Sequence, residues 1–195
     1  MSPRKGFDFI VESVGRIPEH IRPQLKLACN RIEMPELMYI NKLAEQYGVD
    51  LEVERSLSSS ALASLYSQAC LCVYAPVKEP FGLVPLEAMA CGTPVVGVNE
   101  GGVKESVVHE QTGLLVDRDA DRFADAIKKL ILNPRLAKAY GQCGRKHVQE
   151  NWTWAQSTSN VEQHLQACAA AGNSSSIKIH RTPACCEGNN PSILE

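Results

Sequence analysis

The sequence predicts an α/β fold in which a parallel sheet carries helices on both faces. Helix-like and strand-like segments alternate along the chain, as is typical of strand–helix–strand units. Residues 71–75 form a continuous apolar run, which favours a parallel strand covered on both faces. A glycine turn follows this run and leads into a helix. These observations predict a Rossmann-like domain, in which ligands bind at the carboxyl edge of the sheet.

The individual elements follow from apolar spacing and from local start and stop signals. Gly48 suits the left-handed position that ends a helix, and Ser58 or Ser59 suits the N-cap of the next helix. Pro85 suits a first helical turn. The expected helices carry residues 7–17, 37–47, 62–66, 85–90, 122–132 and 135–150. The expected strands are residues 25–29, 49–53, 71–75, 94–98 and 114–116.

Size and charge exclude several classes of function. The chain has 195 residues and is 44% hydrophobic, which is enough for one domain with a core. Its 20 Lys and Arg residues nearly balance its 22 Asp and Glu residues, so the net charge of -2 gives no support for nucleic-acid binding. No apolar run approaches the roughly 20 residues of a membrane helix. The first residues lack the apolar core of a signal peptide, so we expect a cytoplasmic protein.

Cysteine and acidic residues raise the question of a metal site. Six of the eight cysteines lie in apolar or helical segments and are interpreted as small buried side chains; they are Cys29, Cys70, Cys72, Cys91, Cys143 and Cys168. No C-x-x-C pair occurs, which argues against zinc. Asp117 and Asp119 flank Arg118 in a D-x-D pattern, but they precede a helix, so N-capping is expected. We therefore expect no metal.

The chain divides into three expected parts. Residues 1–150 carry the strand–helix alternation and form the predicted Rossmann-like domain. Residues 151–170 contain a Trp-Thr-Trp sequence, interpreted as a packing bend, and are predicted to form a final helix. Residues 171–195 begin with a Gly-Asn-Ser-Ser-Ser stretch and lack periodicity, so a disordered tail is expected.

Residues 79–87 form the most informative segment of the chain. Gly82 lies between the apolar run and the next helix, and a carboxylate stands on each side of it, at Glu79 and Glu87. The positive end of a helix and its free N–H groups suit a bound phosphate. Ionised carboxylates accept hydrogen bonds, which suits the hydroxyl groups of sugars. The segment therefore predicts a sugar-nucleotide site, and residues 1–150 are predicted to form a nucleotide-sugar-binding domain.

An ordered set of motifs around this segment resembles the retaining glycosyltransferases of family 4, which have the GT-B architecture. The resemblance covers about residues 5–165. It includes the Lys5-Gly6 pair, the glutamates Glu79 and Glu87, and residues 81–84, 87–90, 92–96, 100–105, 112–116 and 152–154. This family has two Rossmann-like domains with the active site between them. The chain resembles only the C-terminal, donor-binding half.

The resemblance implies roles for individual residues. Glu79 approaches the donor sugar and steadies positive charge on it, while Glu87 accepts hydrogen bonds from the ribose. The diphosphate is held by backbone N–H groups and by one cation; the implied contacts are Lys5, Phe81, Gly82, Leu83 and Val84. Glu105 supports the donor edge or caps a helix starting at Ser106. The donor is a UDP-, GDP- or ADP-linked hexose, used without a metal or another cofactor.

The chain departs from the family pattern in ways that leave alternatives open. The acceptor domain is absent, as is the first donor-domain strand with its Gly-Arg pair. Residues 27–30 replace a glycine-rich strand end, and Arg55 stands where a glycine is common. The sequence therefore predicts the donor-binding domain of a hexosyltransferase, sucrose-type synthases included, with the acceptor half supplied by another domain or a partner chain. The alternative is a non-catalytic chain of the same fold, either a truncated product or a partner-binding subunit. A phosphorylase relative of the same architecture is a weaker reading.

Overall fold

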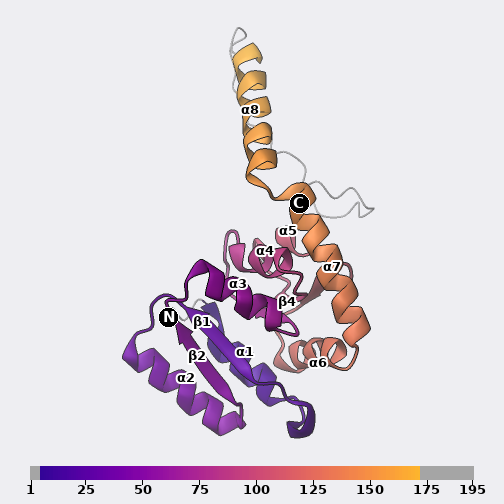
Figure 1. Cartoon of the computed structure of the whole chain (residues 1–195). Coiled ribbons are helices and arrows are strands. Elements are labelled where there is room, and N and C mark those ends of the chain that lie inside the picture. The colour runs from indigo at the N-terminus through magenta and orange to yellow at the C-terminus, as the bar shows by residue number, and fades with distance from the viewer. Residues whose placement is uncertain (1–4, 172–195) are drawn as a thin grey trace. The chain divides into compact units, whose positions relative to one another are not determined.

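The computed structural model describes residues 5–171 of the chain (Figure 1). The chain forms two compact units, Met1–Trp152 and Thr153–Glu195. The second unit contributes the helix α8 (Trp154–Ala171). Except for Ala171, the tail expected at residues 171–195 lies outside the described residues.

The first unit alternates strands and helices as the sequence predicts. The strands are β1 (Leu25–Cys29), β2 (Leu51–Arg55), β3 (Cys72–Tyr74), β4 (Val95–Val98) and β5 (Gly113–Val116). The helices are α1 (Phe7–Gly15), α2 (Met34–Tyr47), α3 (Ser59–Gln68), α4 (Leu83–Ala90), α5 (Val103–Ser106), α6 (Ala120–Ile131) and α7 (Pro134–Asn151), with a 3-10 turn η2 (Glu19–Ile21). All strand pairs are parallel, so the predicted α/β class is confirmed.

The strands form two sheets rather than the single sheet that the sequence predicts. One sheet pairs β1 with β2, in a register that sets Leu27 opposite Val53. The other has the order β3-β4-β5, with Val73 opposite Val96 and Gly97 opposite Leu115. The interruption lies between β1 and β3, which line one cavity and, within residues 5–171, pair only with β2 and β4.

The helix ends show how the sequence specifies these elements. Ser58 accepts a hydrogen bond from the Ala61 N–H at 3.2 Å, and Asp119 accepts one from the Arg122 N–H at 2.9 Å. The capping role expected for the D-x-D segment is thereby confirmed. Gly48 ends α2 with a φ of 64°. Val49 belongs to this cap, because its N–H bonds to the Ala44 carbonyl, and β2 therefore begins two residues later than predicted.

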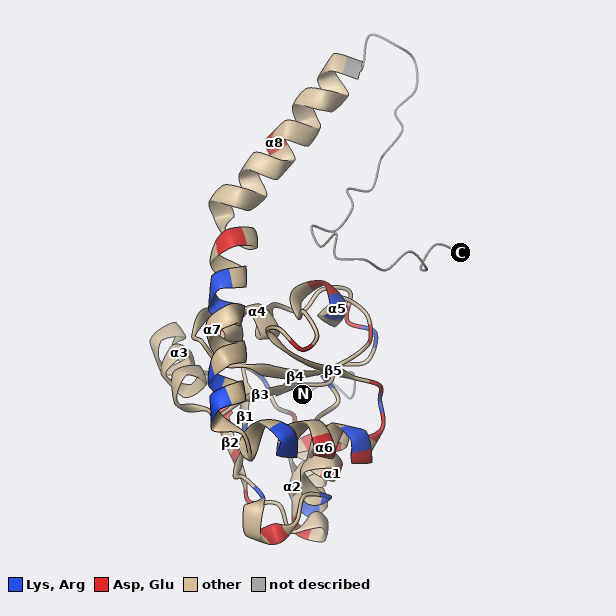
Figure 2. Ribbon diagram, turned by 90° about the vertical axis from the view of Figure 1, so that its right-hand side faces the viewer, with Lys and Arg blue, Asp and Glu red and all other residues tan. Residues whose placement is uncertain are grey.

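The core lies around β4, and helices cover both sides of its sheet. Figure 2 shows α4 and α6 on opposite sides of β3–β5. The stripe of α6 expected from the sequence is buried, with Phe123, Ile127 and Leu130 each at most 1% exposed. Ile17 is also fully buried, although α1 ends before it. No helix among residues 5–171 has both the length and the apolar character that crossing a membrane requires.

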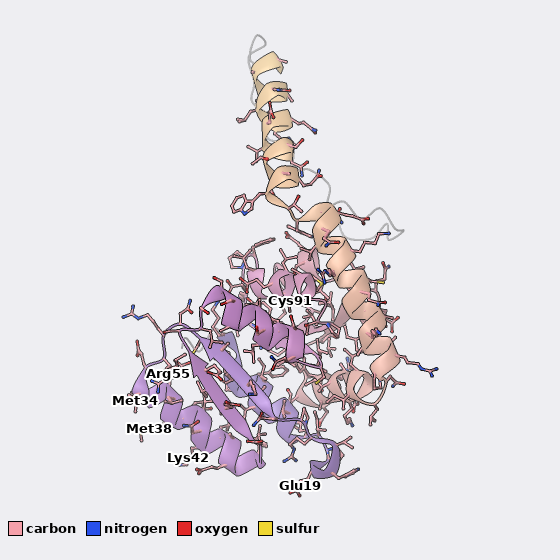
Figure 3. The ribbon with its side chains drawn as sticks, viewed as in Figure 1. Glu19, Met34, Met38, Lys42, Arg55 and Cys91 are labelled. Atoms are coloured by element: carbon pink, nitrogen blue, oxygen red, sulfur yellow. The ribbon has the colours of Figure 1, made fainter. Side chains whose placement is uncertain are left out.

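The burial expected for the cysteines is partly wrong. Cys29, Cys72 and Cys91 are half-buried, whereas Cys70, Cys143 and Cys168 are exposed. Helix α7 buries Ala137, Tyr140, Gly141 and Gly144, which leaves Cys143 on its solvent side. Helical context alone therefore did not decide which cysteines are buried. Figure 3 shows Cys91 at the end of α4 and Arg55 at the end of β2.

Candidate functional site

The centre of the candidate site is the start of α4. Gly82 is the N-cap residue, and no side chain caps this helix. The N–H groups of Leu83 and Val84 therefore point out of the first turn without a helical acceptor, while Pro85 has no N–H to offer. A side chain at Gly82 would lie 2.7 Å from the ring of Tyr74, so this ring requires a glycine here. The fold thus leaves a bare helix N-terminus at the carboxyl end of β3.

Two of the predicted site residues, Lys5 and Glu79, contact each other. Lys5 Nζ lies 3.0 Å from Glu79 Oε2, and the two side chains are 45% and 25% exposed. A nucleotide diphosphate that recruits Lys5 must therefore compete with this carboxylate. The pair places one cation and one anion beside the start of α1.

The loop that carries Glu79 rests on two glycines of the β4–α5 loop. The Gly102 N–H donates to the Glu79 carbonyl at 2.9 Å. Side chains at Gly101 or Gly102 would overlap the carbonyl oxygens of Glu79 and Pro80. Lys78, directly before Glu79, has a φ of 50°, a conformation that is unfavourable for residues other than glycine. The position of Glu79 is therefore set by contact between two backbones.

Arg118 joins the carboxyl ends of three strands. Its guanidinium donates to the carbonyls of Ala75 at 3.1 Å and Pro76 at 2.6 Å. It also forms a two-point contact with the Glu100 carboxylate, at 2.9 and 3.1 Å. The same group lies 5.2 Å from the centre of the Phe9 ring of α1. One planar cation thus fixes the β3–α4 loop, the β4–α5 loop and α1 together.

Glu87 lies one turn into α4 and is oriented by α3. The Tyr66 hydroxyl donates to Glu87 Oε2 at 3.2 Å. Burial raises the pKa of Tyr66, and the neighbouring Cys72 and Glu87 add to this effect, so the hydroxyl stays protonated. Burial likewise raises the pKa of the Cys72 thiol to about 12. Glu87 therefore faces two neutral groups and keeps acceptor capacity for a ligand.

Phe81 packs against the end of α7. Its ring centre lies 5.3 Å from that of Trp152, at an angle of 42°. The Trp152 indole N–H donates to His147 Nε2 at 3.2 Å, and burial lowers the pKa of His147. The neutral imidazole is the form that accepts this bond. The packing bend expected at Trp152 is present, whereas Trp154 is 88% exposed.

The structure brings most of the predicted site residues to one edge of the sheet. Glu105 lies within α5, which ends at Ser106, so it does not cap a helix starting there. Sequence reasoning missed the roles of Arg118 and Tyr66. The D-x-D pattern drew attention to the two acids rather than to the arginine between them, and the partners of Arg118 lie up to 43 residues away.

Comparison with known proteins decides the family. The model of the glycosyl transferases group 1 matches residues 1–147. The chain belongs to this family. It is 39% identical over 117 residues to the mouse alpha-1,3/1,6-mannosyltransferase ALG2, covering 58% of this chain and 28% of that protein.

Two further relatives cover more of the chain. A GDP-mannose-dependent alpha-(1-6)-phosphatidylinositol monomannoside mannosyltransferase of Mycobacterium tuberculosis is 32% identical over 179 residues, covering 87% of this chain and 46% of that protein. The structure of sucrose-phosphate synthase from Thermosynechococcus elongatus matches with a TM-score of 0.77 and 35% identity, covering 87% of this chain and 44% of that one. The chain thus spans less than half the length of these family members.

Replacing Arg118 with alanine tests whether it organises this edge. The substitution leaves two carbonyls and one carboxylate without their donor, so we expect the free energy of unfolding to fall by about 1–3 kcal/mol. Hydrogen exchange in residues 76–82 and 100–103 should become faster. Arg118→Lys should recover only part of this loss, because an ammonium cannot reproduce the planar contacts.

Arg122→Ala is the matched control for Arg118. It removes an ion pair with Asp117 at 3.5 Å, in which both side chains are over two-thirds exposed. Stability should change by less than about 0.5 kcal/mol. Equal effects of the two substitutions on stability and on exchange would contradict the role given to Arg118.

The packing of Phe81 against Trp152 should make the stability of the protein depend on pH, because Trp152 is held by His147. Because burial lowers the pKa of His147 below its usual 6.5, the unfolded chain binds the proton first as the pH falls. The free energy of unfolding therefore has its full value above about pH 6.5, the pKa of His147 in the unfolded chain. It declines as the pH falls from there toward the lower pKa of His147 in the folded protein. Chemical denaturation between pH 8 and pH 5 measures this slope. His147→Gln should flatten the slope, and an unchanged slope would contradict this prediction.

Proposed function

We propose that this chain is the donor-binding half of a retaining, metal-independent glycosyltransferase that takes a hexose from a nucleotide sugar to a hydroxyl acceptor. The observation that carries the proposal is the grouping of the Lys5–Glu79 pair and the uncapped start of α4 at the carboxyl end of β3. This edge is where open parallel sheets bind ligands. Membership of the glycosyl transferases group 1 supports the reaction class.

The proposed chemistry begins with departure of the nucleoside diphosphate. The bond between the anomeric carbon and the phosphate oxygen breaks, and its electron pair stays on that oxygen. The N–H groups of Leu83 and Val84 and the Lys5 ammonium are suited to stabilise the added negative charge. Released from Lys5, Glu79 stabilises the positive charge that develops on the sugar. The acceptor hydroxyl then attacks from the face that the leaving group vacates and passes its proton to the departing phosphate oxygen, so the new C–O bond has the original configuration.

Glu87 is proposed to hold the ribose of the donor. It lies four residues beyond Leu83, or about 6 Å along the helix, which corresponds to the spacing from a diphosphate to its ribose. Tyr66 donates to only one of its oxygens, so the other oxygen can accept from a ribose hydroxyl. The M. tuberculosis relative, whose name specifies GDP-mannose, supports a nucleotide-linked hexose as donor.

The acceptor side is proposed to come from outside these residues. The chain spans 28–46% of the length of the relatives it matches. We therefore assign acceptor recognition to another domain or to a partner chain. A cytoplasmic location remains our prediction.

Isothermal titration with UDP, GDP and ADP, and with the hexose-linked form of whichever binds, tests the donor site. Glu87→Ala should weaken both the diphosphate and its sugar-linked form by about tenfold, the value of one lost charge-assisted hydrogen bond. Glu79→Gln should weaken binding of the sugar-linked form more than binding of the diphosphate. The substitution removes the carboxylate proposed to contact the sugar, whereas it also releases Lys5 to bind the diphosphate. Lys5→Ala should weaken both.

The exposed Glu45 of α2 offers a control. Glu45→Ala should leave every affinity unchanged. Two results would refute the assignment of this site. One is that none of the three nucleotides binds, and the other is that all of them bind with affinities that Glu87→Ala does not change.

One observation favours a second candidate function, that of a partner-binding subunit. Helix α8 exposes Trp154, Val161 and Leu165 at 88%, 58% and 65%. Residues seven and four apart lie near one face of a helix, so these side chains form an apolar stripe. Size-exclusion chromatography with light scattering should then show a concentration-dependent complex that Val161→Glu/Leu165→Glu abolishes. A monomer at all concentrations, with or without these substitutions, would count against association through α8.

A further inference from the structure

The turn that ends α4 sets the position of a buried threonine, Thr93. Gly92 follows the helix in the left-handed conformation, with a φ of 81°. Its N–H donates to the Met89 carbonyl at 2.8 Å, and the Thr93 N–H donates to the Ala88 carbonyl at 3.0 Å. This pair of bonds is a Schellman motif. Thr93 is only 3% exposed, so its hydroxyl is held inside the protein at a place that the end of α4 determines.

Thr93 ties the end of α3 to this turn. Its Oγ1 donates to the Tyr66 carbonyl at 2.6 Å. Helix α3 buries none of its residues fully, whereas α4 buries four. Apolar packing therefore constrains α3 less than it constrains α4, and the hydrogen bond from Thr93 gives α3 a fixed point beside α4.

The hydrogen bonds form a closed circuit that returns to α4 at Glu87. The Tyr66 hydroxyl donates to Glu87 Oε2 at 3.2 Å. Glu87 directly precedes Ala88, the residue whose carbonyl accepts from Thr93. A tyrosine side chain has only two rotatable angles, so fixing its backbone also restricts its hydroxyl. The fold therefore brings a rigid donor to one particular oxygen of Glu87.

Glu87 has the properties of a side chain that needs such a donor. It is exposed, and a long exposed side chain samples several rotamers that must be ordered when a ligand binds. The bond from Tyr66 holds Oε2 before any ligand arrives, so Oε1 already has a defined direction. Because burial raises the pKa of Tyr66, its hydroxyl remains a donor throughout the neutral pH range.

We propose that Tyr66 and Thr93 are positioning residues that make this site select a ribose over a deoxyribose. These roles rest on the proposed function, because they require Glu87 to contact the ribose of the donor. Both residues act through Glu87, since Tyr66 uses its only O–H on Oε2 and Thr93 is buried. A nucleotide that lacks the hydroxyl facing Oε1 gains nothing from the ordered carboxylate.

Isothermal titration of the full chain measures this selectivity. The probes are whichever of UDP, GDP and ADP binds, together with its 2′-deoxy and 3′-deoxy analogues. For the analogue that loses more affinity, the ratio of its Kd to that of the ribonucleotide should be about ten, the value of one charge-assisted hydrogen bond. Tyr66→Phe should lower this ratio to about two, because ordering a free Glu87 weakens the ribonucleotide about fivefold. The affinity of the deoxy analogue should not change.

Thr93→Val tests the same circuit without altering Tyr66 or Glu87. Valine keeps the shape but removes the donor, so the ratio should fall to about five, since Tyr66 keeps its hydroxyl but loses its fixed point. Thr93→Ser should restore the original ratio. Tyr39→Phe is the matched control, because Tyr39 lies on α2 and is 54% exposed; it should leave the ratio unchanged. Adding Tyr66→Phe to Glu87→Ala should have no further effect on the ratio.

The outcomes separate failure of these roles from failure of the donor site. If Glu87→Ala abolishes the selectivity while Tyr66→Phe and Thr93→Val retain it, the donor site stands and the positioning roles are wrong. An equal loss of affinity for the ribonucleotide and its deoxy analogues in Tyr66→Phe would also overturn them, because it would indicate a general structural effect. If the unchanged chain binds nucleotides without any preference for ribose, the ribose contact of Glu87 fails together with both roles.

Discussion

The guanidinium of Arg118 is the contact on which the candidate site depends. It binds the carbonyls that follow β3 and the carboxylate that follows β4, and it stands itself after β5. Loops after parallel strands have few backbone partners of their own, so a shared donor is needed to hold them in one arrangement. A planar group with five N–H donors can serve several acceptors in a fixed planar geometry, which the ammonium of a lysine cannot reproduce. Arg118 therefore holds the three loops at this edge in one arrangement.

Close backbone contact does the rest of the positioning. Gly102 lets the β4–α5 loop touch the loop of Glu79, and Gly82 lets α4 begin against the Tyr74 ring. Because glycines take these places, backbone N–H groups rather than side chains face the edge. Such groups are fixed by the fold and need little reordering when a charged ligand binds. Lys5, Glu79 and Glu87 add charge to this frame.

Local chemistry explains what could be predicted from the sequence. Helix ends depend on residues within one turn, as at the caps Ser58 and Asp119 and at the stop Gly48. The boundaries predicted for these helices therefore lie close to the observed ones. The division of the sheet could not be predicted, because it depends on which strand lies beside β1 and no local signal encodes that neighbour. The partners of Arg118 were missed for the same reason. The glycine turn was predicted, but the contact between Lys5 and Glu79 was not.

The cavity between β1 and β3 and the candidate site share a boundary. Lys5 and Glu87 line the cavity as well as the edge where the diphosphate and ribose are proposed to lie. Lys5 is paired with Glu79, and Glu87 accepts a hydrogen bond from Tyr66. A diphosphate and a ribose that bind at this edge must therefore displace or share these contacts, so their affinity depends on how easily the two side-chain pairs rearrange.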